Sequence, residues 1–350
     1  MSSVNTLEIC LPDDWHLHVR DGEFLPDLLR HTASQFGRAI IMPNLKPPVT
    51  NADMAIAYKT RILNALPPGS NFEPLMVLYL TDNTSADDVK RAKEVGVVGF
   101  KLYPAGATTN SDAGVTDIKK CADALDAMSD CGMPLLVHGE VTHSEIDVFD
   151  REAVFIDQVL EPLRARHPGL KVVFEHITTK QAAQYVESAD TTRLGAIAAT
   201  ITPQHMLYNR NAIFTGGIRP HYYCLPILKR EEHRQELVRV AISGNSRFFL
   251  GTDSAPHLKG TKENACGCAG CYTAWHAMSL YAEVFDAANA LSRLEGFASQ
   301  FGPDFYGLPR NTAKLTLRRE TQQIPNEFPM GNGTVVPLRA GETIAWSIVG

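Results

Sequence analysis

The sequence predicts an α/β protein whose core is a (β/α)8 barrel of the TIM type. Eight short apolar runs, rich in Val, Ile, Leu and Phe, alternate along the chain with longer amphipathic segments. Near-continuous apolar strands separated by helices are typical of a parallel sheet that is buried on both faces. Eight such units in about 250 residues match the size of a barrel of this kind.

The predicted elements follow one another in a regular order. The runs that we predict as strands span residues 10–18, 38–44, 75–80, 97–103, 134–139, 171–177, 196–202 and 247–253. Amphipathic segments at 52–66, 85–95 and 118–128 are predicted as helices, because apolar residues recur there at helical spacing after polar N-cap candidates. A doubly wound open sheet is the alternative fold, but no G-x-G-x-x-G turn follows any of the runs.

We expect one domain over residues 1–350. It would be a single barrel with a short N-terminal strand and a C-terminal extension that starts at about residue 310. Beyond the alternation of strands and helices we find no internal repeat, low-complexity segment or linker.

Composition excludes several functional classes. The chain has 44% hydrophobic and 21% charged residues and a formal net charge of −6, whereas a nucleic-acid or anionic-membrane partner favours a basic surface. We therefore expect a small-molecule substrate. No stretch approaches the ~20 apolar residues that span a bilayer, and the N-terminal M-S-S-V-N-T lacks the plan of a signal peptide. The seven cysteines have no regular spacing, which predicts reduced thiols and a cytoplasmic location.

Residues 14–20 read D-W-H-L-H-V-R and put two histidines at the end of the first predicted strand. In an extended segment the side chains of His16 and His18 point to one face, while Trp15 and Leu17 point to the other. For an isolated H-x-H, a pair of surface or core histidines is as reasonable as a metal site. The other runs favour a metal site, because most of them also carry a polar residue at or near their ends. These residues are Asn44, Lys101, His138, His176 and Asp253.

A barrel would bring these side chains to the carboxyl ends of its strands, where active sites are built. Four imidazoles and a carboxylate exceed the three protein ligands of one catalytic zinc ion, so they indicate two metal ions. Such ligands suit zinc, with cobalt, manganese or nickel as alternatives. A metal pair needs a shared anion, and Lys101 lies inside the apolar run V-V-G-F-K-L-Y. Its amine could take up CO2 as a carbamate; the alternative is an ion pair with an acid such as Glu140 or Glu175.

Several segments carry a specific resemblance. They are P-D-D-W-H-L-H-V-R-D-G, M-P-N-L-K-P-P-V, F-K-L-Y-P-A-G-A-T-T-N, P-L-L-V-H-G-E-V, F-E-H-I-T-T-K, G-G-I-R-P-H-Y-Y-C-L-P-I-L-K-R and F-L-G-T-D-S-A-P-H. From about residue 11 to its end, the chain resembles the dihydroorotases of the bacterial homodimeric type, within the amidohydrolase superfamily. The resemblance implies a homodimeric, zinc-dependent enzyme that interconverts L-dihydroorotate and N-carbamoyl-L-aspartate in de novo pyrimidine (UMP) biosynthesis.

The resemblance also implies two Zn²⁺ ions per subunit. The ligands that it implies are His16, His18, Lys101, His138, His176 and Asp253. Lys101 would be N6-carboxylated and shared by both ions. Asp253 would be the catalytic acid and base, which takes a proton from the attacking water and delivers it to the leaving ring nitrogen.

A further set of residues is implied to bind the substrate. The set comprises Arg20, Asn44, Thr108, Thr109, Leu225, His257 and Ala269. The sequence itself favours Arg20, because continued extended geometry would keep it on the face of His16 and His18, where a guanidinium can bind a carboxylate through two hydrogen bonds.

Two loops complete the predicted site. Residues 104–114 form a small polar loop that the resemblance suggests as a lid, with Thr108 and Thr109 bonded to the ligand. The segment C-G-C-A-G-C (266–271) offers three thiols without a nearby fourth ligand, so we exclude a metal there. The resemblance instead puts the backbone of Ala269 and Leu225 beside the substrate ring.

Two other functions are weighed against this one. A hydantoinase or dihydropyrimidinase opens similar cyclic amides, but its substrates lack the carboxylate that Arg20 and Asn44 would bind. A scaffold that has lost catalysis is a second alternative. It predicts missing ligands, and all six implied ligands are present.

Overall fold

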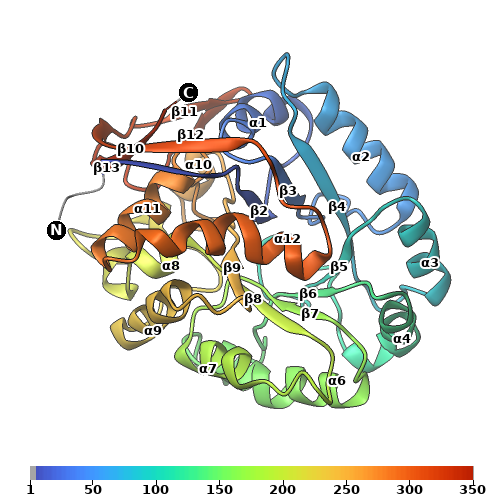
Figure 1. Ribbon diagram of the computed structural model, residues 1–350. Coiled ribbons are helices and arrows are strands. Elements are labelled where there is room, and N and C mark those ends of the chain that lie inside the picture. The colour runs from blue at the N-terminus through green and yellow to red at the C-terminus, as the bar shows by residue number, and fades with distance from the viewer. Residues whose placement is uncertain (1–4, 350) are drawn as a thin grey trace.

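Eight parallel strands form the centre of the molecule, and the computed structural model describes residues 5–349 (Figure 1). Each strand pairs with the next one in the sequence. The strands are β2 Asp13–Leu17, β3 Arg38–Ile41, β4 Glu73–Tyr79, β5 Gly99–Leu102, β6 Leu135–Val137, β7 Val172–Phe174, β8 Ile197–Ile201 and β9 Phe248–Leu250. Each overlaps one of the eight predicted apolar runs, so the prediction of a (β/α)8 barrel is confirmed.

The first and last strands meet just beyond their carboxyl ends and close the barrel. Leu17 and Ser254 form a parallel bridge. The amide of Asp253 donates to the carbonyl of His16 at 2.9 Å, and the amide of His18 donates to the carbonyl of Ser254 at 3.1 Å. This closure brings a histidine pair and an aspartate together although about 240 residues of chain separate them.

Helices connect the strands and surround the sheet (Figure 1). They are α1 Leu25–Ala33, α2 Ala52–Asn64, α3 Ala86–Glu94, α4 Ala122–Cys131, α5 Arg151–Phe155, α6 Glu161–Arg166, α7 Lys180–Ser188, α8 Pro203–Leu207, α9 Glu231–Ile242, α10 Lys259–Lys262, α11 Ala277–Ala287 and α12 Phe301–Tyr306. Polar caps fix the predicted starts: Asn51 accepts from the amide of Met54 at 3.0 Å, and Ser85 and Asp88 cap each other reciprocally. The third predicted helix is divided, since 3-10 turn η2 Ile118–Cys121 precedes α4.

The barrel interior is filled by one cluster of apolar side chains. Trp15, Ile40, Val77 and Phe249 belong to it, together with one residue from each of several other strands. Helix α12 crosses in front of the strands in Figure 1, and its Tyr306 stacks on Trp15 with ring centroids 4.5 Å apart. A packed interior leaves the carboxyl ends of the strands as the place for a site.

The two ends of the described chain share a second sheet. β1 Thr6–Cys10 pairs antiparallel with β10 Lys314–Gln323, which pairs with β13 Thr343–Val349. β11 Phe328–Met330 and β12 Gly333–Val335 form a hairpin. The division of residues 1–350 into one domain with a C-terminal extension from about 310 stays a prediction.

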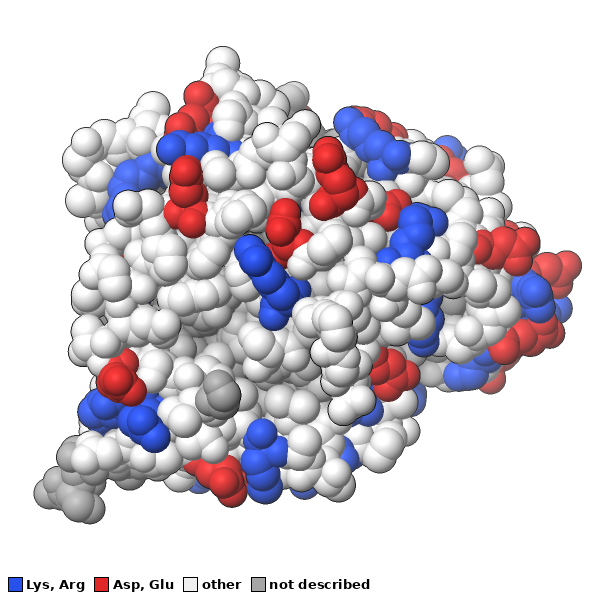
Figure 2. All heavy atoms as spheres, turned by 90° about the horizontal axis from the view of Figure 1, so that it is seen from above, with Lys and Arg blue, Asp and Glu red and all other residues white. Residues whose placement is uncertain are grey.

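The surface carries mixed charge. Figure 2 shows Lys and Arg interspersed with Asp and Glu on one face of the molecule. Among residues 5–349, no helix has the length and apolar character needed to cross a bilayer. The first residues of the predicted N-terminal segment, 1–4, lie outside the described part of the chain.

Gly302→Ala is expected to destabilise the fold. A Cβ at position 302 would lie 1.9 Å from Nε1 of Trp15, so α12 would have to move away from the barrel interior. Overpacking of this kind costs about 1–3 kcal/mol, measurable as a lower free energy of unfolding in urea. Gly260→Ala is the control, since a Cβ there meets no atom within 4 Å. Equal stability of the two variants would contradict this packing.

Candidate metal centre and substrate site

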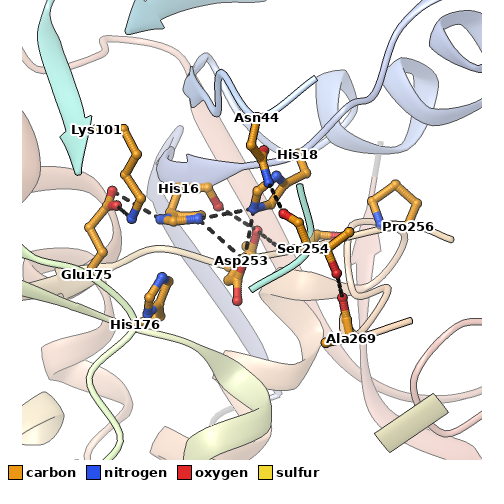
Figure 3. Close-up of polar contacts among 12 residues, drawn as sticks. His16, His18, Asn44, Lys101, Glu175, His176, Asp253, Ser254, Pro256 and Ala269 are labelled. Carbon is orange, nitrogen blue, oxygen red and sulfur yellow. Dashed lines mark hydrogen bonds and ion pairs between the residues drawn. The ribbon is translucent and has the colours of Figure 1, made fainter. Parts of the chain in front are cut away.

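Two histidines and an aspartate converge at the closure of the barrel (Figure 3). Nε2 of His16 lies 3.3 Å from Nε2 of His18. Oδ1 of Asp253 lies 3.3 Å from the first of these nitrogens and 3.2 Å from the second. All three side chains are buried. Three potential ligand atoms therefore point at one position.

The strand that carries the histidines departs from simple alternation. Its pairing with β3 shifts register between Asp14 and Leu17, and such an irregularity rotates the following side chains. Trp15 packs in the barrel interior, whereas Leu17 packs in the layer beneath the helices. The predicted shared face of Trp15 and Leu17 is wrong, although the two histidines do converge.

A second group of side chains adjoins the first through His16, which lies between the Lys101–Glu175 pair and His18 in Figure 3. Its Nδ1 lies 3.0 Å from Oε1 of Glu175, and its ring centroid lies 4.8 Å from that of His176. The amine of Lys101, fully buried on β5, pairs with the other carboxylate oxygen of Glu175. This ion pair is the alternative that the sequence left open for Lys101.

His138 lies at the edge of the second group. Its ring centroid is 4.9 Å from that of His176, and its Nε2 lies 2.8 Å from Oε2 of Glu140. The structure thus gathers all six predicted ligand residues at one end of the barrel. Among residues 5–349, two sets have ligand atoms within 4.8 Å of one another: His16, His18 and Asp253, and His16, Glu175 and His176.

The backbone beneath these residues is held in place by a buried carboxylate. Asp14 accepts hydrogen bonds from the amides of Thr252 at 2.9 Å and His16 at 3.2 Å. His176 and Asp253 have positive φ angles of 41° and 45°, a conformation that costs free energy in residues other than glycine. Hydrogen bonds hold both residues in this conformation: the amide of Asp253 donates to the carbonyl of His16 at 2.9 Å, and the amide of His176 donates to Oγ1 of Thr200 at 2.7 Å.

Electrostatics in the cluster keep the two buried carboxylates, Glu175 and Asp253, ionised. Burial alone would lower the pKa of His16, but Glu175 and Asp253 raise it to about 9. Burial would raise the pKa of Asp253, but hydrogen bonds and charge from His16 and His18 hold it well below its usual range. Burial lowers the pKa of His18 to about 4. Burial would raise the pKa of Glu175, but His16 and Lys101 lower it, so both buried carboxylates stay ionised with these groups as their partners.

The donor set fits a metal centre. Imidazole nitrogens and carboxylate oxygens are ligands that zinc accepts. Nδ1 of His176 is buried and has no hydrogen-bond partner among the described residues. Facing ring nitrogens such as those of His16 and His18 would share one ion readily.

The predicted substrate residues surround the mouth of this centre. A small cavity above the ligands is lined by Arg20, Asn44, Thr108, Thr109, Leu225 and Ala269. It continues into an outer cavity of about 540 Å³, which His257 also lines. Asn44 donates to the carbonyl of Thr109 at 3.1 Å, and Asn110 donates to the carbonyl of Asn44 at 3.0 Å. The loop at 104–114 therefore packs directly against the site.

Arg20 reaches the mouth by a different route from the predicted one. β2 ends at Leu17, and Arg20 has a φ of 60°, so extended geometry does not persist to it. Its Nε donates to the carbonyl of Pro256 at 2.8 Å, and its Nη2 lies 3.0 Å from Nε2 of His257. These contacts, rather than strand alternation, aim the guanidinium at the cavity.

Sequence reasoning missed part of the site. It assigned Glu175 only as a possible partner of Lys101. An acid inside an apolar strand run and next to a histidine could have indicated that Glu175 belongs to the site. It did not select Asp14 or Thr252, which hold the ligand-bearing backbone. Tyr103, which lines the small cavity, gives no signal in the sequence.

Comparisons with known proteins agree on one family. Residues 13–317 match the amidohydrolase family. A dihydroorotase of Cupriavidus pinatubonensis is 69% identical over 341 residues, which cover 97% of this chain and 98% of that protein.

Two crystal structures extend this likeness. A dihydroorotase from Campylobacter jejuni has a TM-score of 0.90 and 36% identity, with 100% of this chain and 99% of that chain covered. A dihydroorotase from Saccharomyces cerevisiae, in complex with 5-fluoroorotic acid, has a TM-score of 0.88 and 33% identity, with 99% of both chains covered.

Chelation of divalent metal is expected to lower the unfolding temperature. A ligand that binds only the native state stabilises it by about 2.7 kcal/mol at a free concentration of ~100 Kd. His18→Gln should lose most of this dependence, as followed by differential scanning calorimetry with and without zinc. His221→Gln is the matched control, because His221 pairs with Glu263 at 2.9 Å, outside the predicted ligand set. Wild-type protein with the same melting curve in chelator and in zinc would rule out the centre.

Proposed function

We propose, since this chain belongs to the amidohydrolase family, that it is a dihydroorotase. It is a hydrolase that interconverts L-dihydroorotate and N-carbamoyl-L-aspartate in de novo pyrimidine (UMP) biosynthesis. The near full-length identity to dihydroorotases supports this assignment. The observation that carries it is a guanidinium, that of Arg20, at the mouth of a buried histidine and aspartate cluster.

Two divalent metal ions, zinc by resemblance, would be held at the cluster. The proposed ligands are His16, His18, Lys101, His138, His176 and Asp253. Bound there, zinc would supply polarisation of the ring amide and a lowered pKa for the attacking water.

Lys101 would serve this centre as a carbamate. Its amine attacks CO2, the N–C bond forms and one proton leaves, so a neutral side chain becomes an anion. Beside ionised Glu175 and Asp253, a third buried negative charge is unfavourable unless cations neutralise it. Carboxylation of Lys101 and metal binding should therefore depend on each other.

Asp253 would move the proton of the reaction. It accepts a proton from the attacking water as the oxygen bonds to the ring carbonyl carbon. When the C–N bond breaks, it delivers that proton to the leaving ring nitrogen; ring closure reverses both transfers. Its backbone hydrogen bond to His16 fixes the position of the carboxylate.

The loops at the mouth would bind the substrate. Nη1 of Arg20 donates no hydrogen bond to the described residues, so it can bind the ring carboxylate together with Asn44 and His257. The backbone groups of Leu225 and Ala269 would pair with the imide edge of the ring. Thr108 and Thr109, in the loop that packs on Asn44, would bond to the ligand and exclude water.

The subunit arrangement and location complete the proposal. A homodimer is supported by the resemblance to the bacterial homodimeric type. A cytoplasmic location is supported by seven unpaired cysteines, since free thiols are typical of reducing compartments.

Purified protein is expected to hydrolyse L-dihydroorotate and not dihydrouracil, which lacks the carboxylate. Arg20→Met should lower kcat/KM for dihydroorotate ~30-fold or more, because losing one partner of a buried charged hydrogen bond costs about 2–5 kcal/mol. Arg61→Met is the control, since Arg61 is exposed, lines the outer cavity and pairs with the half-buried Asp21. A preference for dihydrouracil would indicate a dihydropyrimidinase, and turnover of neither substrate by zinc-loaded protein would indicate an inactive scaffold.

A further inference from the structure

Lys262, at the end of α10, is a buried cation outside the predicted site. Only 4% of its surface is exposed. No carboxylate among the described residues forms an ion pair with it. Burial of an ammonium costs free energy unless each of its donors has a hydrogen-bond partner. The partners of the Lys262 amine therefore indicate why it is buried.

Three backbone carbonyls surround the amine. Nζ donates to the carbonyl oxygens of Tyr223 at 3.0 Å, Cys268 at 2.8 Å and Gly270 at 2.6 Å. An ammonium has three donors, and each one has a partner here. Lys262 thus joins two chain segments by charge-assisted hydrogen bonds, which are stronger than neutral ones.

These two segments carry the backbone that recognises the ring in the proposed function. Cys268 and Gly270 flank Ala269, and Tyr223 lies two residues before Leu225. The amide of Gly270 also donates to the carbonyl of Tyr223 at 3.0 Å. The lysine therefore holds the peptide group that precedes Ala269 and the one that follows Gly270, and links both to the segment of Leu225.

The same loop touches the carboxylate end of the site. The carbonyl oxygen of Ala269 lies 2.9 Å from Nε2 of His257. A Cβ at Gly270 would lie 2.6 Å from the carbonyl oxygen of Ala255, so this turn has little room to adjust. Small displacements of the loop would reach the ligand directly.

We infer that Lys262 is a positioning residue for recognition of the imide edge of the substrate ring, acting by fixing the backbone of Ala269 and Leu225. The inference rests on the proposed function. Lys262 does not touch the substrate. Its role predicts a larger defect for ligands that present an imide than for ligands that present carboxylates alone.

Lys262→Met tests this role through inhibition constants for two ligands. 5-Fluoroorotate presents both a carboxylate and an imide edge, whereas succinate presents carboxylates alone. The variant should raise the inhibition constant for 5-fluoroorotate ~10-fold or more, because the backbone that pairs with the imide is no longer held in place, and should raise that for succinate by a clearly smaller factor. Lys259→Met is the matched control, because Lys259 lies on the same helix and is exposed.

A second variant separates positioning from general damage. Lys262→Ala should recover 5-fluoroorotate affinity and kcat/KM when ethylammonium is added, because the small cation restores donors to the three carbonyls. An equal rise of both inhibition constants, or none, in active Lys262→Met protein would overturn the inference alone. Wild-type protein that neither hydrolyses dihydroorotate nor binds 5-fluoroorotate would overturn the proposed function and this inference with it.

Discussion

The site depends on how the closed barrel compensates the negative charge of two buried carboxylates, those of Glu175 and Asp253. Glu175 and Asp253 lie on either side of His16, deep at the carboxyl ends of the strands and out of contact with bulk water. Carboxylates in such surroundings require a cation. The ring of His16, which contacts both carboxylates, and the amine of Lys101, which pairs with Glu175, answer this need within the chain.

Chemistry and recognition come from different parts of the fold. The groups proposed for chemistry stand on strands or directly after them, where the barrel holds them rigidly. The groups proposed for recognition stand on loops, which is where barrels vary their specificity. Lys262 serves the recognition part, because its hydrogen bonds join two of these loops, whereas the ligand residues are held by the strands.

Local pattern was enough to predict much of this architecture. Apolar runs located all eight barrel strands, and polar residues at their ends located His16, His18, His138, His176 and Asp253. The sequence did not predict the orientation of side chains that is set by contacts between distant parts of the chain. The guanidinium of Arg20 is aimed by Pro256 and His257, and the amine of Lys262 by carbonyls of Tyr223, Cys268 and Gly270. No spacing in the sequence encodes such contacts.

Carbon-13 NMR of protein equilibrated with labelled bicarbonate tests most directly whether carboxylation of Lys101 and metal binding depend on each other. In the zinc-loaded protein the account predicts a carbamate resonance that Lys101→Ala lacks. Chelation should abolish the resonance, because the amine of Lys101 then returns to its ion pair with Glu175. A carbamate signal that persists in metal-free protein, or its absence from active zinc-loaded protein, would contradict the account.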